Sequence, residues 1–259
     1  MISEFPLFAF TTLTGLGAGA LLASAVFPER GETKRAWLFP LVMLALMGVG
    51  ALASVTHLGR PQYMVYMLAN PTSSLVMEGI FAGLTCVALI VDVALVVDVA
   101  LDIDVALAAK SAAVNRVVRI VATVLAVLLM FVQAYAYAGS YGNAAWAAAS
   151  VWPFFVLGSL GCGFTLWALF AQAGEGFTKV CGVALALACV SFAWEAATFA
   201  GAGADATLLI VGAVLAAVAA ACALAKGFAS AKLPWSVVAV AAVAALVVAR
   251  YGFYAASIL

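Results

Sequence analysis

The feature that most constrains this chain is a series of continuous apolar blocks. Each is about 20 residues long, which is the length a helix needs to cross a hydrocarbon core about 30 Å thick. Inside a bilayer, every backbone polar group must be hydrogen-bonded within its own helix or within a closed barrel. The blocks are continuous rather than alternating, which favours helices over barrel strands. Because 68% of the 259 residues are hydrophobic and only 8% are charged, a soluble globular domain is excluded.

We therefore predict an all-α, polytopic membrane protein with eight transmembrane helices, forming a single integral membrane domain over residues 1–259 and arranged as two four-helix bundles. Glu4 stands where a secretory signal would carry a basic residue, so the first span is expected to be retained. The predicted spans are 5–27, 36–56, 74–97, 115–138, 152–172, 178–200, 206–225 and 234–256. An acidic stretch runs from Asp92 to Lys110, and because Asp98 and Asp102 lie one turn apart, the third helix is expected to run on into water before it ends.

An internal similarity links residues 14–19 (Thr-Gly-Leu-Gly-Ala-Gly) and 158–163 (Gly-Ser-Leu-Gly-Cys-Gly), in the first and fifth spans. It has two interpretations. Small residues let membrane helices pack closely, and this alone could produce the pattern. Alternatively, the chain consists of two four-helix halves in parallel orientation.

Basic residues indicate the orientation in the membrane. The first, third, fifth and seventh connections carry nine lysines and arginines, whereas the N-terminus and the other connections carry only Arg60. By the positive-inside rule, the odd-numbered connections are cytoplasmic and both termini are extracytoplasmic.

Few ionisable residues lie within the spans, and such residues are candidates for function because charge is costly in a bilayer. They are Glu78, Glu195 and Arg250, of which Arg250 is expected to pair with an acid or with backbone carbonyls. His57 is the single histidine, so this chain cannot ligate a haem between two histidines. The five cysteines form no CxxC pair and are interpreted as small buried hydrophobes, not iron–sulfur or zinc ligands. With a net charge of zero, nothing indicates nucleic-acid binding.

His57 and Glu78 are expected to lie close together near the outer membrane surface. His57 ends the second span, and Glu78 follows 21 residues later, about one turn into the third, which Ser73 can cap. A quinol gives up two electrons and two protons, and an imidazole and a carboxylate could accept those protons. Arg60 would add a positive charge that favours deprotonation. The alternative is a pair that only holds two helices together.

The segment His57-Leu58-Gly59-Arg60-Pro61, followed by Asn70, Ser73 and Glu78, resembles the motif of the dimethyl sulfoxide reductase anchor subunit family (DmsC type). Two further features agree with this resemblance: Tyr141 with Trp146 and Pro153 before the fifth span, and Arg-Tyr-Gly-Phe-Tyr at 250–254. The sequence departs from the family pattern at Val76 and Met77, where the family has a serine and an arginine. One positive charge beside Glu78 is therefore absent, and Arg60 is the candidate substitute.

The resemblance implies a membrane anchor in a bacterial or archaeal inner membrane that oxidises menaquinol. The electrons would pass to a four-cluster iron–sulfur subunit and then to a molybdopterin catalytic subunit, and the anchor itself would hold no haem and no cluster. It further implies His57 and Glu78 as the catalytic pair, with Gly59, Arg60 and Ser73 completing the quinol-binding set. Glu195 is a candidate for a proton path, or for a structural hydrogen bond.

Two other functions remain open. A proton- or ion-coupled transporter usually has its site at the midplane on broken helices, whereas the charges here gather near one surface. A purely structural anchor would use His57 and Glu78 only to hold helices together.

Overall fold

The chain folds into helices throughout the part that the computed structural model describes, which is residues 4–28, 37–56, 58–100, 105–140, 142–171, 174–229 and 231–256. No strand occurs in these ranges, which confirms the predicted all-α class. The elements are α1 (Phe5–Val26), α2 (Leu38–Thr56), the 3₁₀ turn η1 (Pro61–Tyr63), α3 (Met64–Met67), α4 (Ser74–Ala100), α5 (Val105–Ala138), α6 (Val151–Trp167), α7 (Glu175–Gly201), α8 (Thr207–Phe228) and α9 (Trp235–Ala255).

Among the described helices, seven are long and apolar enough to cross a membrane, and α6 is a shorter apolar helix. With its 17 residues, α6 reaches about 25 Å at 1.5 Å per residue. The prediction of a polytopic helical membrane protein with about eight spans is confirmed. The fifth span ends earlier than predicted, at Trp167 instead of residue 172, because Ala168–Phe170 form turns.

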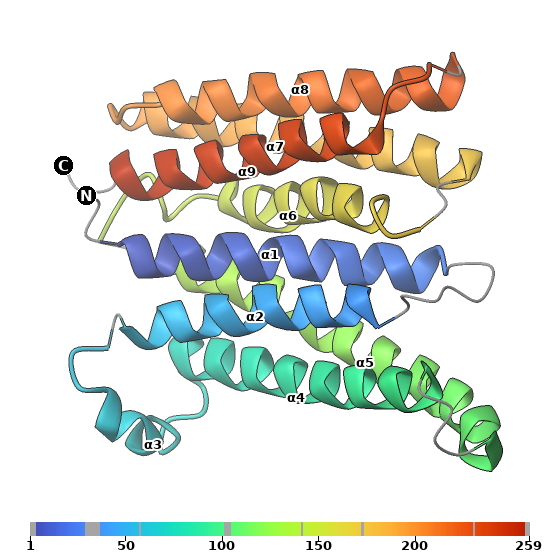
Figure 1. Ribbon diagram of the computed structural model, residues 1–259. Helices are drawn as coiled ribbons and strands as arrows, with labels where there is room; N and C mark the ends of the chain where they lie inside the picture. Colours follow the sequence, from blue (N-terminus) through green and yellow to red (C-terminus); the bar gives the residue numbers. More distant parts are fainter. Residues whose placement is uncertain are drawn as a thin grey trace.

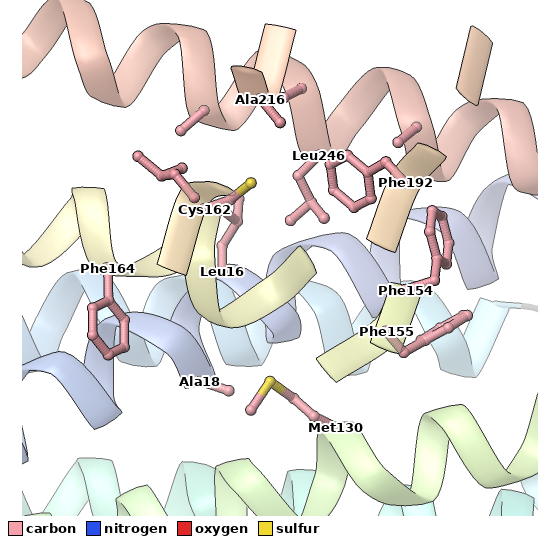
Figure 2. Packing of buried hydrophobic residues seen from close by; sticks show 14 of the residues in the cluster. Leu16, Ala18, Met130, Phe154, Phe155, Cys162, Phe164, Phe192, Ala216 and Leu246 are labelled. Atoms are coloured by element: carbon pink, nitrogen blue, oxygen red, sulfur yellow. The ribbon is translucent and has the colours of Figure 1, made fainter. Parts of the chain in front are cut away.

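The helices form two bundles of four, as predicted (Figure 1). In the first bundle, α1 packs against α2 and α5, and α4 completes the ring between them. In the second, α6 packs against α7 and α9, and α8 lies between those two. The bundles meet mainly along α1 and α6, which run in the same direction (Figure 1). Figure 2 shows part of the buried cluster near this seam, including Leu16, Met130 and Cys162.

The backbones of α1 and α6 touch at a pair of glycines. A Cβ atom on Gly163 would lie 2.6 Å from the carbonyl oxygen of Leu16 and 2.7 Å from Cα of Gly19. Gly19 and Gly163 therefore permit a contact that any side chain would obstruct. The similarity between residues 14–19 and 158–163 coincides with this seam, so close packing accounts for it. It also joins the first helix of each bundle, and the two halves are indeed parallel.

The acidic stretch from Asp92 to Lys110 is helical over most of its length. Helix α4 runs on past the predicted end of the third span at residue 97, as expected, and continues to Ala100, whereas α5 begins at Val105, earlier than predicted. Asp92 is fully buried within α4, accepts a hydrogen bond from Asn115, and pairs with Arg119, whose Nε lies 3.0 Å from Oδ2. Because α5 supplies this positive charge, the carboxylate can remain inside the helical pair instead of ending the helix.

Candidate functional site

A cavity of about 310 Å³ lies between α1, α2, α3 and α4. It is near the end of the molecule where both chain termini lie (Figure 1). Its walls include Phe10 of α1, Val55 of α2, Met64 of α3 and the following Leu68. Among the described lining residues, Glu78 of α4 is the one that carries charge. The cavity therefore offers an apolar chamber with a single carboxylate in its wall.

Glu78 is almost completely buried, at 6% exposure. Its Oε1 accepts no hydrogen bond from any described residue. Buried polar atoms in proteins nearly always have a partner, from the protein, from water or from a ligand. Glu78 lies on the first turns of α4, which begins at Ser74, so the fold places this carboxylate just inside the rim of the bundle. A ligand that donates a hydrogen bond would satisfy the open oxygen.

His57 lies outside the described residues, so its predicted approach to Glu78 stays a prediction. The residues on either side of it are informative. Val55 and Leu58 both line the cavity, and the Leu58 N–H donates to the Val55 carbonyl over 3.1 Å. The chain that carries His57 thus borders the same cavity as Glu78.

The other predicted quinol-binding residues that the structure describes do not line the cavity. Gly59 and Arg60 are exposed, in the segment between α2 and η1, and they are not among the lining residues. Among the described glycines only Gly203 has a positive φ, so the backbone at Gly59 does not require glycine. Ser73 precedes α4, and its carbonyl oxygen accepts the Met77 N–H over 2.9 Å. Of the predicted quinol-binding residues that the structure describes, Glu78 is the one that lines the cavity.

Several apolar residues of the cavity wall are also exposed on the surface of the molecule. They include Val65, at 71%, and Leu68, at 57%, in the segment between α2 and α4. Ile80 of α4, at 37%, is a third, and it lies within a membrane-spanning helix. The cavity wall is therefore partly exposed.

A second polar cluster lies in the other bundle, around Arg250 of α9. Arg250 is fully buried, and its Nη2 donates to the Phe155 carbonyl over 3.2 Å and to Ser159 Oγ over 3.1 Å. The guanidinium carbon also lies 3.5 Å from the centre of the Phe155 ring, a cation–π contact. The expectation that Arg250 pairs with an acid or with backbone carbonyls is confirmed for the carbonyl.

Glu195 of α7 belongs to this cluster. It is fully buried and interacts with the Ser150 hydroxyl and with the charge of Arg250. Neither of its oxygens, however, is in a hydrogen bond of good geometry with a described residue. The sequence singled out Glu195 and Arg250 separately, and the fold brings them into one cluster.

The two further features that agree with the family resemblance, one at Trp146 and the other at residues 250–254, pack against each other. Trp146 stacks on Phe253 with ring centres 5.3 Å apart, and its Nε1 donates to the Phe253 carbonyl over 3.3 Å. Tyr137 of α5 meets Trp146 edge to face, with ring centres 5.2 Å apart. Tyr141 lies outside the described residues. The sequence analysis did not single out Tyr137, because nothing in the local sequence relates it to Trp146 or Phe253.

Within the described chain, no three histidine, cysteine, aspartate or glutamate side chains come together as a metal site would require.

The model of one protein family, described as the DMSO reductase anchor subunit (DmsC), matches residues 1–255, nearly the whole chain. No curated protein and no solved structure matches the chain significantly.

Proposed function

The chain belongs to the DMSO reductase anchor subunit family, and we propose that it oxidises menaquinol in the cavity beside Glu78 and passes the electrons to an iron–sulfur subunit. Family membership and the membrane-spanning helices make it a membrane anchor subunit of a reductase complex of the DMSO reductase type. The proposal adds the reaction, its substrate and its site.

The observation that carries the proposal is the open carboxylate oxygen of Glu78 at a cavity whose lining is mostly apolar and partly exposed. Its volume of about 310 Å³ falls at the lower end of the range of small-molecule sites. Apolar walls suit a fused aromatic ring, and the partly exposed wall suits an isoprenoid tail that remains in the bilayer. The quinol hydroxyl supplies the hydrogen bond that Oε1 lacks.

In the proposed reaction, Glu78 accepts the proton of one quinol hydroxyl and His57 accepts the other. The two electrons leave to the clusters of a four-cluster iron–sulfur subunit, which reduces a molybdopterin catalytic subunit. With the termini extracytoplasmic, as the basic residues indicate, the cavity and the docking face of these partners lie on the extracytoplasmic side. Gly59 and Arg60 follow the lining residue Leu58 in the chain, and Ser73 precedes the lining residue Leu75 by two positions, so the proposal keeps them as residues near the quinol head group.

The cavity favours quinol chemistry over a purely structural anchor. A glutamate that only held two helices together would direct its oxygens at a partner on the neighbouring helix, whereas Oε1 of Glu78 accepts nothing from the described neighbours and lies beside a cavity. A transporter is disfavoured because α4 is a continuous helix of 27 residues, with no break at Glu78.

The test uses the complete complex, purified with its partners, and follows reduction of the partner's iron–sulfur clusters by a soluble menaquinol analogue, read by electron paramagnetic resonance. This readout does not depend on the terminal acceptor. We expect Glu78→Gln to assemble with an unchanged iron content and to reduce the clusters roughly 100-fold more slowly, since a positioned proton acceptor contributes at least that factor. Glu175→Gln, an exposed change on α7, is the control. Equal rates in Glu78→Gln and wild type would refute the site, and a preparation without iron would refute the complex.

A further inference from the structure

Arg250 and Glu195 are oppositely charged residues that do not line the quinol cavity. Both are fully buried within the second bundle. Between them they have four polar atoms without a hydrogen bond of good geometry to a described residue, namely Nε and Nη1 of Arg250 and both oxygens of Glu195. Open polar atoms on two buried ionic side chains that lie within electrostatic range of each other indicate internal water between them.

Hydrogen-bonded hydroxyl groups lie within electrostatic range of both this cluster and Glu78 of the quinol cavity. Phe10 lines the cavity, and its neighbour Thr11 forms a hydrogen bond with the Tyr254 hydroxyl over 3.1 Å. Tyr254 in turn is hydrogen-bonded to Tyr137, and the two ring centres are 5.5 Å apart. Both tyrosines lie within electrostatic range of Glu78 on one side and of Arg250 on the other.

A second pair of hydroxyl groups connects Glu195 with the outside of the bundle. The Ser150 hydroxyl interacts with Glu195 and forms a 2.8 Å hydrogen bond with Thr198 Oγ1. Ser150 is buried, whereas Thr198 is partly exposed. Both residues lie near the end of α7 and the start of α6, at the end of the molecule that holds the chain termini (Figure 1).

We propose that Tyr137, Tyr254, Arg250 and Glu195 form a proton path that carries a proton from Glu78 through the interior to the extracytoplasmic surface at Ser150 and Thr198. This inference rests on the proposed function. The O–H bond of the quinol breaks and an O–H bond forms on Glu78. The proton then moves through tyrosine hydroxyls and bound water to the Glu195 carboxylate and leaves to external water, which restores Glu78 as a carboxylate. No electron takes this path, since both go to the partner's iron–sulfur clusters.

Arg250 positions the path and does not itself release a proton. Its guanidinium is fixed by the Phe155 carbonyl, by Ser159 and by the Phe155 ring. With Glu195 ionised, the pair is neutral inside an apolar bundle. With Glu195 protonated, the arginine charge is left unbalanced, which is costly at low dielectric, so the proton is passed outward instead of being stored.

The experiment compares Glu195→Gln and Tyr254→Phe with two matched controls in the complete complex. Glu175→Gln is the control on α7. Tyr135→Phe is a control on α5, because Tyr135 lies two residues before Tyr137 and is 54% exposed. Steady-state menaquinol oxidation is measured in H₂O and in D₂O, and quinone-analogue binding is measured separately. We expect Glu195→Gln to lower kcat about tenfold or more, with an unchanged KM and a larger solvent isotope effect, because proton transfer becomes limiting.

Tyr254→Phe should act in the same direction, and Glu195→Asp should restore part of the rate, while both controls match wild type. If Glu195→Gln does not accumulate, Tyr254→Phe and Glu195→Asp decide the outcome. Full turnover with an unchanged isotope effect in these variants, while Glu78→Gln is inactive, would overturn the path and leave the proposed function intact. Wild-type complex that does not oxidise menaquinol would overturn both.

Discussion

Replacing Gly163 with alanine introduces a methyl group into the contact between α1 and α6. The new Cβ would lie 2.6 Å from the Leu16 carbonyl oxygen, 2.7 Å from Gly19 Cα and 2.9 Å from the Ala20 nitrogen. All three are backbone atoms, so none can rotate away. Carbon atoms rest about 3.5–4.0 Å apart, and the helices must therefore separate by about 1 Å at the crossing.

The expected cost follows from two opposing contributions. Overpacking of a close contact destabilises by about 1–3 kcal/mol. Alanine in a helix recovers about 0.5–1 kcal/mol relative to glycine. The midpoints of these two ranges leave a net destabilisation of about 1 kcal/mol, which should weaken the seam between the bundles.

Thermal denaturation in detergent, followed by the fraction of monodisperse protein after heating, measures this effect. Gly48→Ala is the matched control, because a Cβ at Gly48 of α2 meets nothing within 4 Å. The control should keep or slightly raise the midpoint, whereas Gly163→Ala should lower it. An unchanged or higher midpoint in Gly163→Ala would show that α1 and α6 do not touch as described.

Two further predictions concern the cavity and the orientation. Gly83→Phe should raise the KM for a menaquinol analogue without loss of assembly, because Gly83 lines the cavity and its Cβ position is open; an unchanged KM, with Gly48→Phe as the control, would argue that the substrate binds elsewhere. A reporter that functions only outside the cytoplasm should be active when it is fused after Ala256, and a reporter that functions only inside the cytoplasm should be inactive there. The reverse result would invert the assigned topology.

The spans could be predicted closely from the sequence because the bilayer leaves the backbone few alternatives. Seven of the eight described spans have their N-terminal end within about three residues of the prediction, in keeping with the usual uncertainty of element ends. The remaining helix, α5, begins ten residues early, at Val105, but its membrane-spanning part begins at Ala113, two residues before the predicted start at 115. The sequence displays the charge of Asp92 but not Arg119 facing it from the next helix, and it is this partner that keeps the acid inside the helical pair.

The candidate site could be predicted only in part. Glu78 stood out because a charge in an apolar block is rare, and the structure places it in the wall of a cavity. The cavity itself depends on Phe10 and on the short helix α3, which no local pattern relates to Glu78. Likewise, 55 residues separate Glu195 from Arg250, and only the ring of α6, α7 and α9 brings them into one cluster.

The packing of α1 against α6 also affects the environment of the buried Arg250. A Cβ on Gly15 of α1 would collide with the Ser159 hydroxyl, which is the group that accepts a hydrogen bond from Arg250. Unlike the backbone atoms around Gly163, this hydroxyl can rotate away, although the Ser159 Cβ, 3.1 Å from the new methyl group, must shift by a few tenths of an ångström. Gly15→Ala should therefore cost less stability than Gly163→Ala while it removes one of the bonds that fix the guanidinium. We expect Gly15→Ala to assemble with a smaller loss of midpoint than Gly163→Ala, yet to slow menaquinol oxidation and enlarge its solvent isotope effect. Normal turnover in a well-assembled Gly15→Ala complex would show that menaquinol oxidation does not depend on the hydrogen bond between Ser159 and Arg250.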